Sequence, residues 1–126
     1  MRLLHHPEGR METVTLTHGK ASETSCQLYL FGATLTSWKV HGTEMIFVAS
    51  KAKLDGSKAI RGGIPICFPA FGAWPFGAQH GFARNSKDWK VTQQPKVDAD
   101  SGDVEVSPFI SFKYSLLIKF RLLKFY

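Results

Sequence analysis

Residues 59–85 hold the side chains of this chain that are best suited to chemistry. Arg61 and Arg84 can clamp an anion, because each guanidinium presents a fork of N–H donors. Gln79 can hydrogen-bond hydroxyl groups, and His80 can bind or transfer a proton near neutral pH. This combination of donors and acceptors suits a ligand that carries several hydroxyl groups.

Glycines and prolines around these groups predict shaped turns rather than a helix. Gly62 and Gly63 follow Arg61 directly and allow positive φ or a close approach to a ligand. Pro65 and Pro69 fix φ and interrupt any helix. Flat apolar surface that can stack on the C–H face of a pyranose ring comes from Phe68, Phe71, Trp74, Phe76 and Phe82. The segment therefore predicts a sugar site better than it predicts a core.

Each assignment has a structural alternative when it is taken singly. An arginine in a β-protein is more often a surface group or a structural hydrogen-bond donor. A lone histidine more often fills a polar gap. Only the combination of these residues favours a binding site.

Composition limits the class of protein. With 126 residues and 44% hydrophobic residues, the chain can form one globular domain with a modest core. A formal net charge of +6 favours anionic partners, and charge alone does not choose among phosphorylated metabolites, nucleic acid and acidic lipid. Cys26 and Cys67 lack CxxC spacing, so we expect reduced thiols and no metal site. The chain shows no secretion signal and no apolar run of membrane-spanning length, which predicts a cytoplasmic protein.

The pattern of short Thr-, Val- and Leu-rich runs between turn residues predicts an all-β protein. Strands are expected at 13–17, 25–31, 33–40, 44–48, 89–92 and 103–106, with an exposed turn at 95–102. In the third of these strands, period-two counting places Thr34, Thr36, Trp38 and Val40 on one face. The apolar run at 45–48 is typical of a strand that is buried on both sides.

The last twenty residues, 107–126, differ in style because they contain basic but no acidic side chains. Their alternating polarity predicts one long strand with an apolar face made of Ile110, Phe112, Tyr114, Leu116, Ile118, Phe120 and Leu122. The basic residues Lys113, Lys119, Arg121 and Lys124 raise the alternative of electrostatic attachment to an acidic membrane or nucleic acid. No nucleic-acid-binding signature accompanies them, so we expect neither a nucleic acid nor a membrane as partner.

The strings AIRGGIPICFPAFG and QHGFARN together resemble motifs of the hexose-6-phosphate mutarotases, the glucose-6-phosphate 1-epimerase branch of the aldose 1-epimerase superfamily. The resemblance extends less sharply upstream through LYLFGATLTSWKV and EMIFVASKAKLDGSKAI. It implies a galactose-mutarotase-like antiparallel β-sandwich, incomplete in this chain, with residues 1–106 as its N-terminal part and 107–126 as a divergent tail.

The implied activity is interconversion of the α and β anomers of glucose 6-phosphate and related aldose phosphates. The resemblance implies that the protein uses no metal and no organic cofactor, and that its partner is a small sugar phosphate. It identifies Arg61, Gln79, His80 and Arg84 as substrate-binding residues. The oligomeric state stays open.

Anomer interconversion needs a base for the proton of the anomeric hydroxyl and an acid for the ring oxygen. The resemblance assigns these roles to a glutamate and a second histidine that lie well beyond the motifs in a longer chain. Here no histidine follows His80, and the only later glutamate is Glu105, in an exposed strand pattern. We therefore expect this chain to hold no catalytic residue and to be inactive alone. The alternative is a non-catalytic sugar-phosphate-binding protein.

Overall fold

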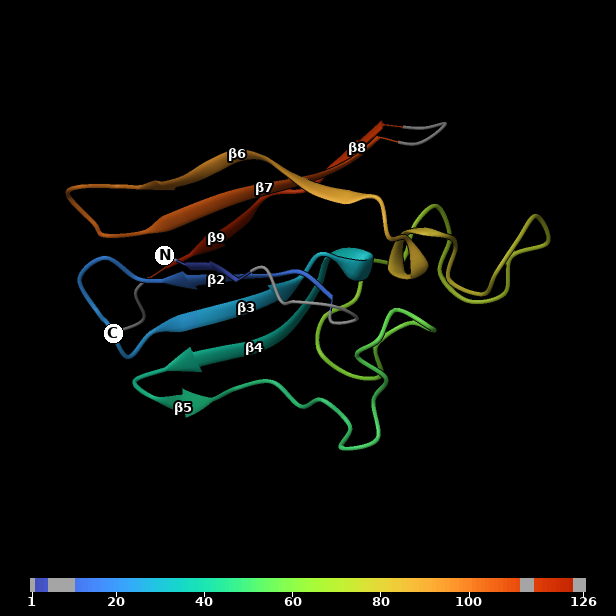
Figure 1. Ribbon diagram of the computed structural model, residues 1–126, viewed down its shortest axis with the longest axis horizontal. Helices are drawn as coiled ribbons and strands as arrows, with labels where there is room; N and C mark the ends of the chain where they lie inside the picture. The colour runs from blue at the N-terminus through green and yellow to red at the C-terminus, as the bar shows by residue number, and fades with distance from the viewer. Residues whose placement is uncertain (1, 5–10, 112–114, 124–126) are drawn as a thin grey trace.

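Two antiparallel β-sheets form the fold, and a long irregular segment connects them (Figure 1). The computed structural model describes residues 2–4, 11–111 and 115–123. The first sheet contains, in spatial order, β1 (Arg2–Leu4), β2 (Thr13–Thr17), β3 (Ser25–Tyr29), β4 (Thr34–Val40) and β5 (Thr43–Glu44). The second sheet contains β6 (Trp89–Val97), β7 (Val104–Ser111), β8 (Ser115–Leu117) and β9 (Phe120–Leu122).

The predicted all-β class is confirmed. Helical structure among the described residues consists of two short 3-10 turns, η1 (Phe31–Ala33) and η2 (Ala83–Asn85). No helix in this part of the chain has the length and apolar character needed to cross a lipid bilayer.

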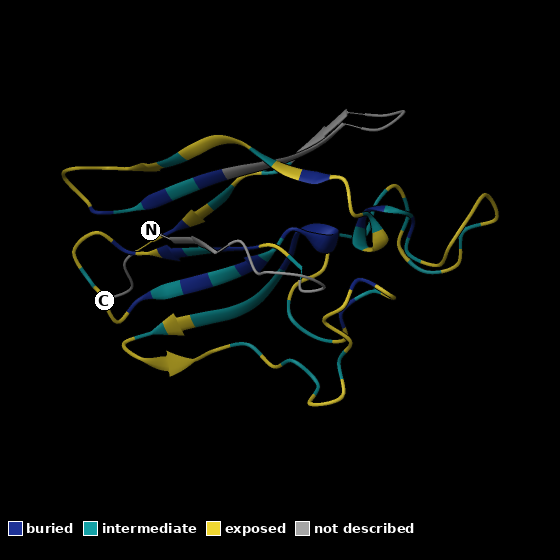
Figure 2. Ribbon diagram, in the orientation of Figure 1, coloured by how far each residue is buried: buried dark blue, intermediate teal, exposed yellow. Residues whose placement is uncertain are grey.

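One hydrophobic core holds the two sheets together. In the first sheet, Val14 pairs with Leu28 and Leu16 pairs with Cys26, so these side chains share one face. They form a single buried cluster with residues of the second sheet, including Trp89, Val104, Val106 and Leu122. Burial of each large side chain contributes about 1.5–3 kcal/mol, so this shared face is the main source of stability. Figure 2 shows the buried positions on β3, η1 and the start of β7, while β5 is exposed.

A buried histidine also joins the two sheets. The side chain of His18, in the turn after β2, is fully buried, and its Nδ1 accepts N–H groups from Lys20 and Ala21. Its Nε2 lies 3.4 Å from Oδ1 of Asp103, and Arg121 in β9 donates to Oδ2 of the same carboxylate at 2.9 Å. Both ring nitrogens of His18 are thus satisfied, which is the structural role that a lone histidine more often plays.

A bulge in β4 changes the predicted facing of its side chains. Gln27 pairs with Ser37 but Leu28 pairs with Leu35, so one extra residue lies in β4 between these pairs. Cys26 pairs with Trp38. Leu35 and Trp38 therefore share the inner face, and the predicted face made of Thr34, Thr36, Trp38 and Val40 is wrong.

The buried strand predicted at 45–48 is also wrong. β5 ends at Glu44, whose Oε1 accepts the backbone N–H groups of Trp38 and Ile46. Beyond it, Met45 and Phe47 are 56% and 77% exposed. An apolar run has the same local pattern whether or not a second layer covers it, and here no described layer does.

The tail does not form one long strand, because Ile118 and Lys119 separate β8 from β9. The predicted alternation holds within β9, where Leu122 is buried and Arg121 is exposed. Lys119 forms an ion pair of 3.3 Å with Glu105, and Arg121 is held by Asp103, so these cations already have acidic neighbours. Lys113 and Lys124 lie outside the described residues. The predicted boundary between the N-terminal part, residues 1–106, and the tail, residues 107–126, falls within β7.

The two cysteines should differ in reactivity. Burial raises the pKa of the Cys26 thiol to about 11, against a smaller lowering by its hydrogen bond to the backbone of Leu16. Near pH 8 only about one Cys26 in a thousand is then a thiolate. Iodoacetamide should modify the half-buried Cys67 and leave Cys26 intact, which peptide mapping by mass spectrometry would measure. In urea both should react, and equal rates in native buffer would contradict this burial.

Candidate functional site

Backbone pairing fixes the segment that carries Arg61. The backbone carbonyl of Arg61 accepts the N–H of Ala49, and the N–H of Gly63 donates to the carbonyl of Phe47 at 2.8 Å. Ile64 exchanges both backbone hydrogen bonds with Leu35 in β4. The segment thus continues the first sheet beside β4, and the Arg61 side chain is exposed.

The two glycines after Arg61 are required by this close packing. Gly62 and Gly63 have φ of 112° and 67°. A Cβ on Gly63 would lie 2.2 Å from the carbonyl oxygen of Leu35, and one on Gly62 would lie 2.6 Å from that of Phe47. Both the positive φ and the contact exclude a side chain. The glycines therefore approach other parts of the chain, rather than leaving room for a ligand.

A second closed loop holds His80. Its backbone N–H donates to the carbonyl of Gly72 at 2.8 Å, and its Nδ1 accepts the N–H of Gly72 at 2.9 Å. His80 has a φ of 66°, and its ring meets that of Phe71 edge-on with centroids 4.9 Å apart. Because Nδ1 is an acceptor here, the neutral ring carries its proton on Nε2. Nε2–H is thus the group that His80 can offer to a ligand oxygen.

The carbonyl of Phe68 closes the base of this loop. It accepts the N–H groups of Phe82 at 2.9 Å and Ala83 at 3.3 Å. Gly81 makes this possible, since a Cβ there would lie 2.0 Å from the same oxygen. Trp89, which is buried, donates its indole N–H to the carbonyl of Ala83 at 2.9 Å. The loop is therefore fastened to the core.

Arg84 lies partly inside this loop. One terminal nitrogen donates to the backbone carbonyl of Gln79 at 3.0 Å. Its Nε is buried without a hydrogen-bond partner among the described residues. The backbone at Arg84 packs on η1, where a Cβ on Gly32 would lie 2.3 Å from the Arg84 carbonyl oxygen. These contacts of its side chain and backbone hold Arg84 in place where the chain leaves the loop.

The predicted aromatic surface divides into two groups. Phe68 and Phe82 meet edge-on at 5.8 Å and pack against the core. Phe71 and Phe76 are 85% and 84% exposed, and Trp74 contacts Phe76 at 6.1 Å. Only the second group is available for stacking on a ligand.

The structure gathers three of the four predicted site residues in one loop. Gln79, His80 and Arg84 belong to the loop closed by Phe68 and Gly72, and the side chain of Gln79 is exposed. Arg61 comes from the separate segment beside β4. Within the described residues its side chain forms no hydrogen bond or ion pair, and no described contact joins it to the other three.

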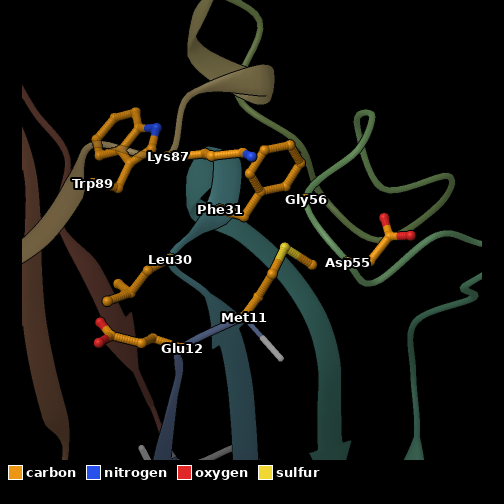
Figure 3. Close-up of a pocket in the computed structure, with 8 residues that line it drawn as sticks. All are labelled: Met11, Glu12, Leu30, Phe31, Asp55, Gly56, Lys87 and Trp89. Atoms are coloured by element: carbon orange, nitrogen blue, oxygen red, sulfur yellow. The ribbon is translucent and has the colours of Figure 1, made fainter. Parts of the chain in front are cut away.

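A cavity of about 220 Å³ lies elsewhere, beneath η1 (Figure 3). Its lining consists of Met11, Glu12, Leu30, Phe31, Asp55, Gly56, Lys87 and Trp89. The figure shows the Lys87 side chain alongside the Phe31 ring, and the Met11 thioether points toward that ring. None of the four predicted site residues lines it, so this cavity is distinct from the predicted sugar site.

Sequence reasoning missed the role of the Gly72 backbone in orienting His80. Nothing in the string AFGAW identifies a partner eight residues away, because the contact depends on how the loop closes. The signal that was present is the pair of glycines at the two ends of the loop, Gly72 and Gly81, both with positive φ.

The comparisons with known proteins agree with one another. The sequence profile of the family described as Aldose 1-epimerase matches residues 12–120. A protein of Cenchrus ciliaris named "Putative glucose-6-phosphate 1-epimerase" is 40% identical over 119 residues, which cover 93% of this chain and 33% of that protein. A protein of the same name from Escherichia coli (strain K12) is 35% identical over 106 residues, which cover 74% of this chain and 35% of that protein.

The structure is similar to a solved "putative mutarotase (YeaD)" from Salmonella typhimurium, with a TM-score of 0.74 and 24% sequence identity. The match covers 97% of this chain and 46% of that one. The predicted mutarotase-like fold is thereby confirmed. The chain spans about a third of the length of the two curated relatives.

The loop should be intolerant of a side chain at Gly81. Gly81→Ala places a methyl group against the Phe68 carbonyl and should lower the free energy of unfolding by at least about 3 kcal/mol. Gly42→Ala is the matched control, because Gly42 has nearly the same φ, 78° against 76°, but no atom within 4 Å of its added Cβ. It should cost only about 1 kcal/mol. Urea denaturation measures both, and equal losses would contradict the close contact.

Proposed function

Because the chain belongs to the aldose 1-epimerase family, we propose that its segments at 61–64 and 68–84 bind an aldose 6-phosphate, with glucose 6-phosphate as the preferred ligand. The relatives' names supply the substrate of this proposal. The chemistry of the two segments supports it, since they combine an exposed guanidinium, a fixed imidazole and exposed aromatic rings.

The observation that carries the proposal is the fixed orientation of His80. Two hydrogen bonds to Gly72 hold its backbone and its Nδ1, which leaves the Nε2–H as a donor of defined direction. A preorganised donor of this kind loses little conformational entropy when it binds a sugar oxygen. Phe71, which contacts the same ring, offers an exposed apolar face beside it.

The two arginines have different roles in this proposal. Arg61 is exposed, and its side chain has no partner among the described residues, so its whole guanidinium can bind phosphate oxygens. Arg84 already donates to the Gln79 carbonyl and therefore positions the loop as well as adding positive charge. Gln79 presents an exposed amide for hydroxyl groups. Phosphate contact is thus assigned mainly to Arg61.

Binding is separate from proton transfer in this chain. Ring opening needs a base at the anomeric hydroxyl and an acid at the ring oxygen. His80 uses Nδ1 within the loop, so it cannot pass a proton from one ring nitrogen to the other without breaking the bond to Gly72. We therefore assign it to binding and expect the proton-transfer pair to come from residues outside this sequence.

Binding of glucose 6-phosphate should depend on Arg61. Arg61→Ala removes a charge-assisted contact to phosphate and should weaken binding about 10- to 100-fold. The affinity for glucose, which has no phosphate, should change little. Isothermal titration calorimetry measures both ligands. Lys96→Ala removes one positive charge from an exposed position in β6 and serves as the control that should leave affinity unchanged.

The same titrations test His80. His80→Ala should weaken binding of both sugars, because the lost donor contacts the sugar rather than the phosphate. His41→Ala is the control, since His41 also has positive φ, 49°, but lies in the exposed turn after β4. Absence of saturable binding to the wild-type chain, or equal effects of the site and control variants, would overturn the assignment.

The chain alone should not accelerate anomer exchange, although it binds the sugar phosphate. Each positioned proton-transfer group usually adds about 10²–10⁴-fold, and we assign no such pair to the segments at 61–64 and 68–84. Exchange between the α and β signals of glucose 6-phosphate, followed by NMR, should match that of buffer. This outcome together with saturable binding would support the assignment of these segments to sugar binding without proton transfer. Acceleration that Arg61→Ala and His80→Ala abolish would instead show that a complete active site is present.

A further inference from the structure

The cavity beneath η1 has a lining that divides into an apolar wall and a charged rim (Figure 3). Leu30, Phe31 and Trp89 are buried and form the wall. The half-buried Met11 completes this wall, and the exposed Lys87 belongs to the rim. Ligand sites in proteins combine apolar walls of this kind with a few polar groups that fix the orientation of the ligand. The cavity therefore has the composition of a small-molecule site.

Hydrogen bonds fix the walls of the cavity in the absence of a ligand. The N–H of Leu30 donates to the carbonyl of Glu12 at 3.0 Å, which joins two segments of the lining. The N–H of Gly32, in η1, donates to the carbonyl of Ser86 at 2.9 Å and ties η1 to the segment that leads to Trp89. The indole of Trp89 is held by its own hydrogen bond to a backbone carbonyl. A site with fixed walls loses little conformational entropy when a ligand binds.

The charged groups of the rim favour an anion beside Lys87. Within the described residues the Lys87 ammonium forms no hydrogen bond or ion pair. The carboxylate of Asp55 already accepts the N–H of Ser57 at 2.9 Å. Figure 3 shows the carboxylates of Glu12 and Asp55 pointing away from the Lys87 ammonium. The formal net charge of +6 also attracts anions to the molecule as a whole.

We propose that this cavity binds a small organic carboxylate, whose apolar part packs against the buried wall and whose charge lies on the Lys87 ammonium. The volume of about 220 Å³ is below the ~300–1,000 Å³ of drug-sized sites, so the ligand has the size of a single ring or a short alkyl chain. A sugar is disfavoured here, because its hydroxyl groups would lie against apolar side chains without hydrogen-bond partners. The ligand is therefore distinct from the sugar phosphate.

Two lining residues allow a test that leaves the buried wall intact. Met11→Trp places a larger side chain in the space that the ligand needs, and Met11 is only half-buried. Met45→Trp is its control, because Met45 is 56% exposed and lies outside the cavity. Lys87→Ala removes the ammonium from the rim. Lys90→Ala is the matched control, since it removes the same charge from an exposed position in β6 outside the cavity.

The probe is benzoate, titrated into the 126-residue chain and followed by isotope-edited NMR of the indole N–H of Trp89. We expect saturable shifts with a dissociation constant on the order of 1 mM, because a small ligand makes few contacts. Met11→Trp should abolish these shifts, while Met45→Trp should leave the constant within about twofold.

The charge is tested with benzyl alcohol, an uncharged probe with the same ring. Lys87→Ala should weaken benzoate binding about fivefold, since an ion pair at the rim is exposed to solvent. Binding of benzyl alcohol should not change in this variant. Lys90→Ala should leave the binding of both probes unchanged.

The proposal is overturned if benzoate gives no saturable shift or if the two tryptophan variants bind it equally. It is also overturned if Lys87→Ala weakens both probes to the same extent, or if the cation benzylammonium binds more tightly than benzoate. Saturating glucose 6-phosphate should leave benzoate binding unchanged, and displacement would assign the cavity to the sugar site. The other readouts involve no sugar, so failure here is distinguishable from failure of the sugar-binding proposal.

Discussion

The indole of Trp89 joins the hydrophobic core to the glycine-rich loop, and the arrangement of the candidate site depends on it. Trp89 is buried at 2% exposure, and its N–H donates to the Ala83 carbonyl. Ala83 in turn donates to the Phe68 carbonyl, which closes the loop that holds His80. A buried indole N–H without an acceptor costs about 1–3 kcal/mol, so the core and the loop constrain each other. The base of the loop that holds His80 is therefore fixed by the core, while the hydrogen bonds with Gly72 orient its ring.

Local sequence was sufficient where a single physical requirement determines the structure. β2 was predicted with its observed bounds, because Thr-Val-Thr-Leu-Thr alternates without interruption. Gly62 and Gly63 were predicted to allow positive φ or a close approach to a ligand, and both adopt positive φ. The reason for glycine at these positions differs from the one expected, since each approaches a carbonyl of the same chain rather than a ligand. Sequence identifies a glycine's freedom, but only the fold shows what comes close to it.

Features that depend on contacts distant in sequence could not be predicted. The bulge in β4 changes which residues face inward, and no residue between Thr34 and Trp38 signals it. The exposure of Met45 and Phe47 depends on whether another layer covers them, which their apolar character does not reveal. The tautomer of His80 depends on the N–H of Gly72, which only loop closure brings close. Motif residues were thus found by type, while their orientations required the fold.

Backbone pairing with β4 fixes the segment that carries Arg61. Arg61 lies three residues before Ile64, which exchanges backbone hydrogen bonds with Leu35 in β4. Arg61 is the one predicted site residue outside the closed loop, and among the described residues the backbone hydrogen bonds around it fix its position. The pairing of Ile64 with Leu35 holds the 61–64 segment against β4 and limits the positions open to Arg61. Preorganisation of this kind strengthens ligand binding without adding a contact to the ligand. The pairing with β4 therefore contributes to the placement of the arginine for which we propose phosphate binding, although the paired backbone need not touch the sugar.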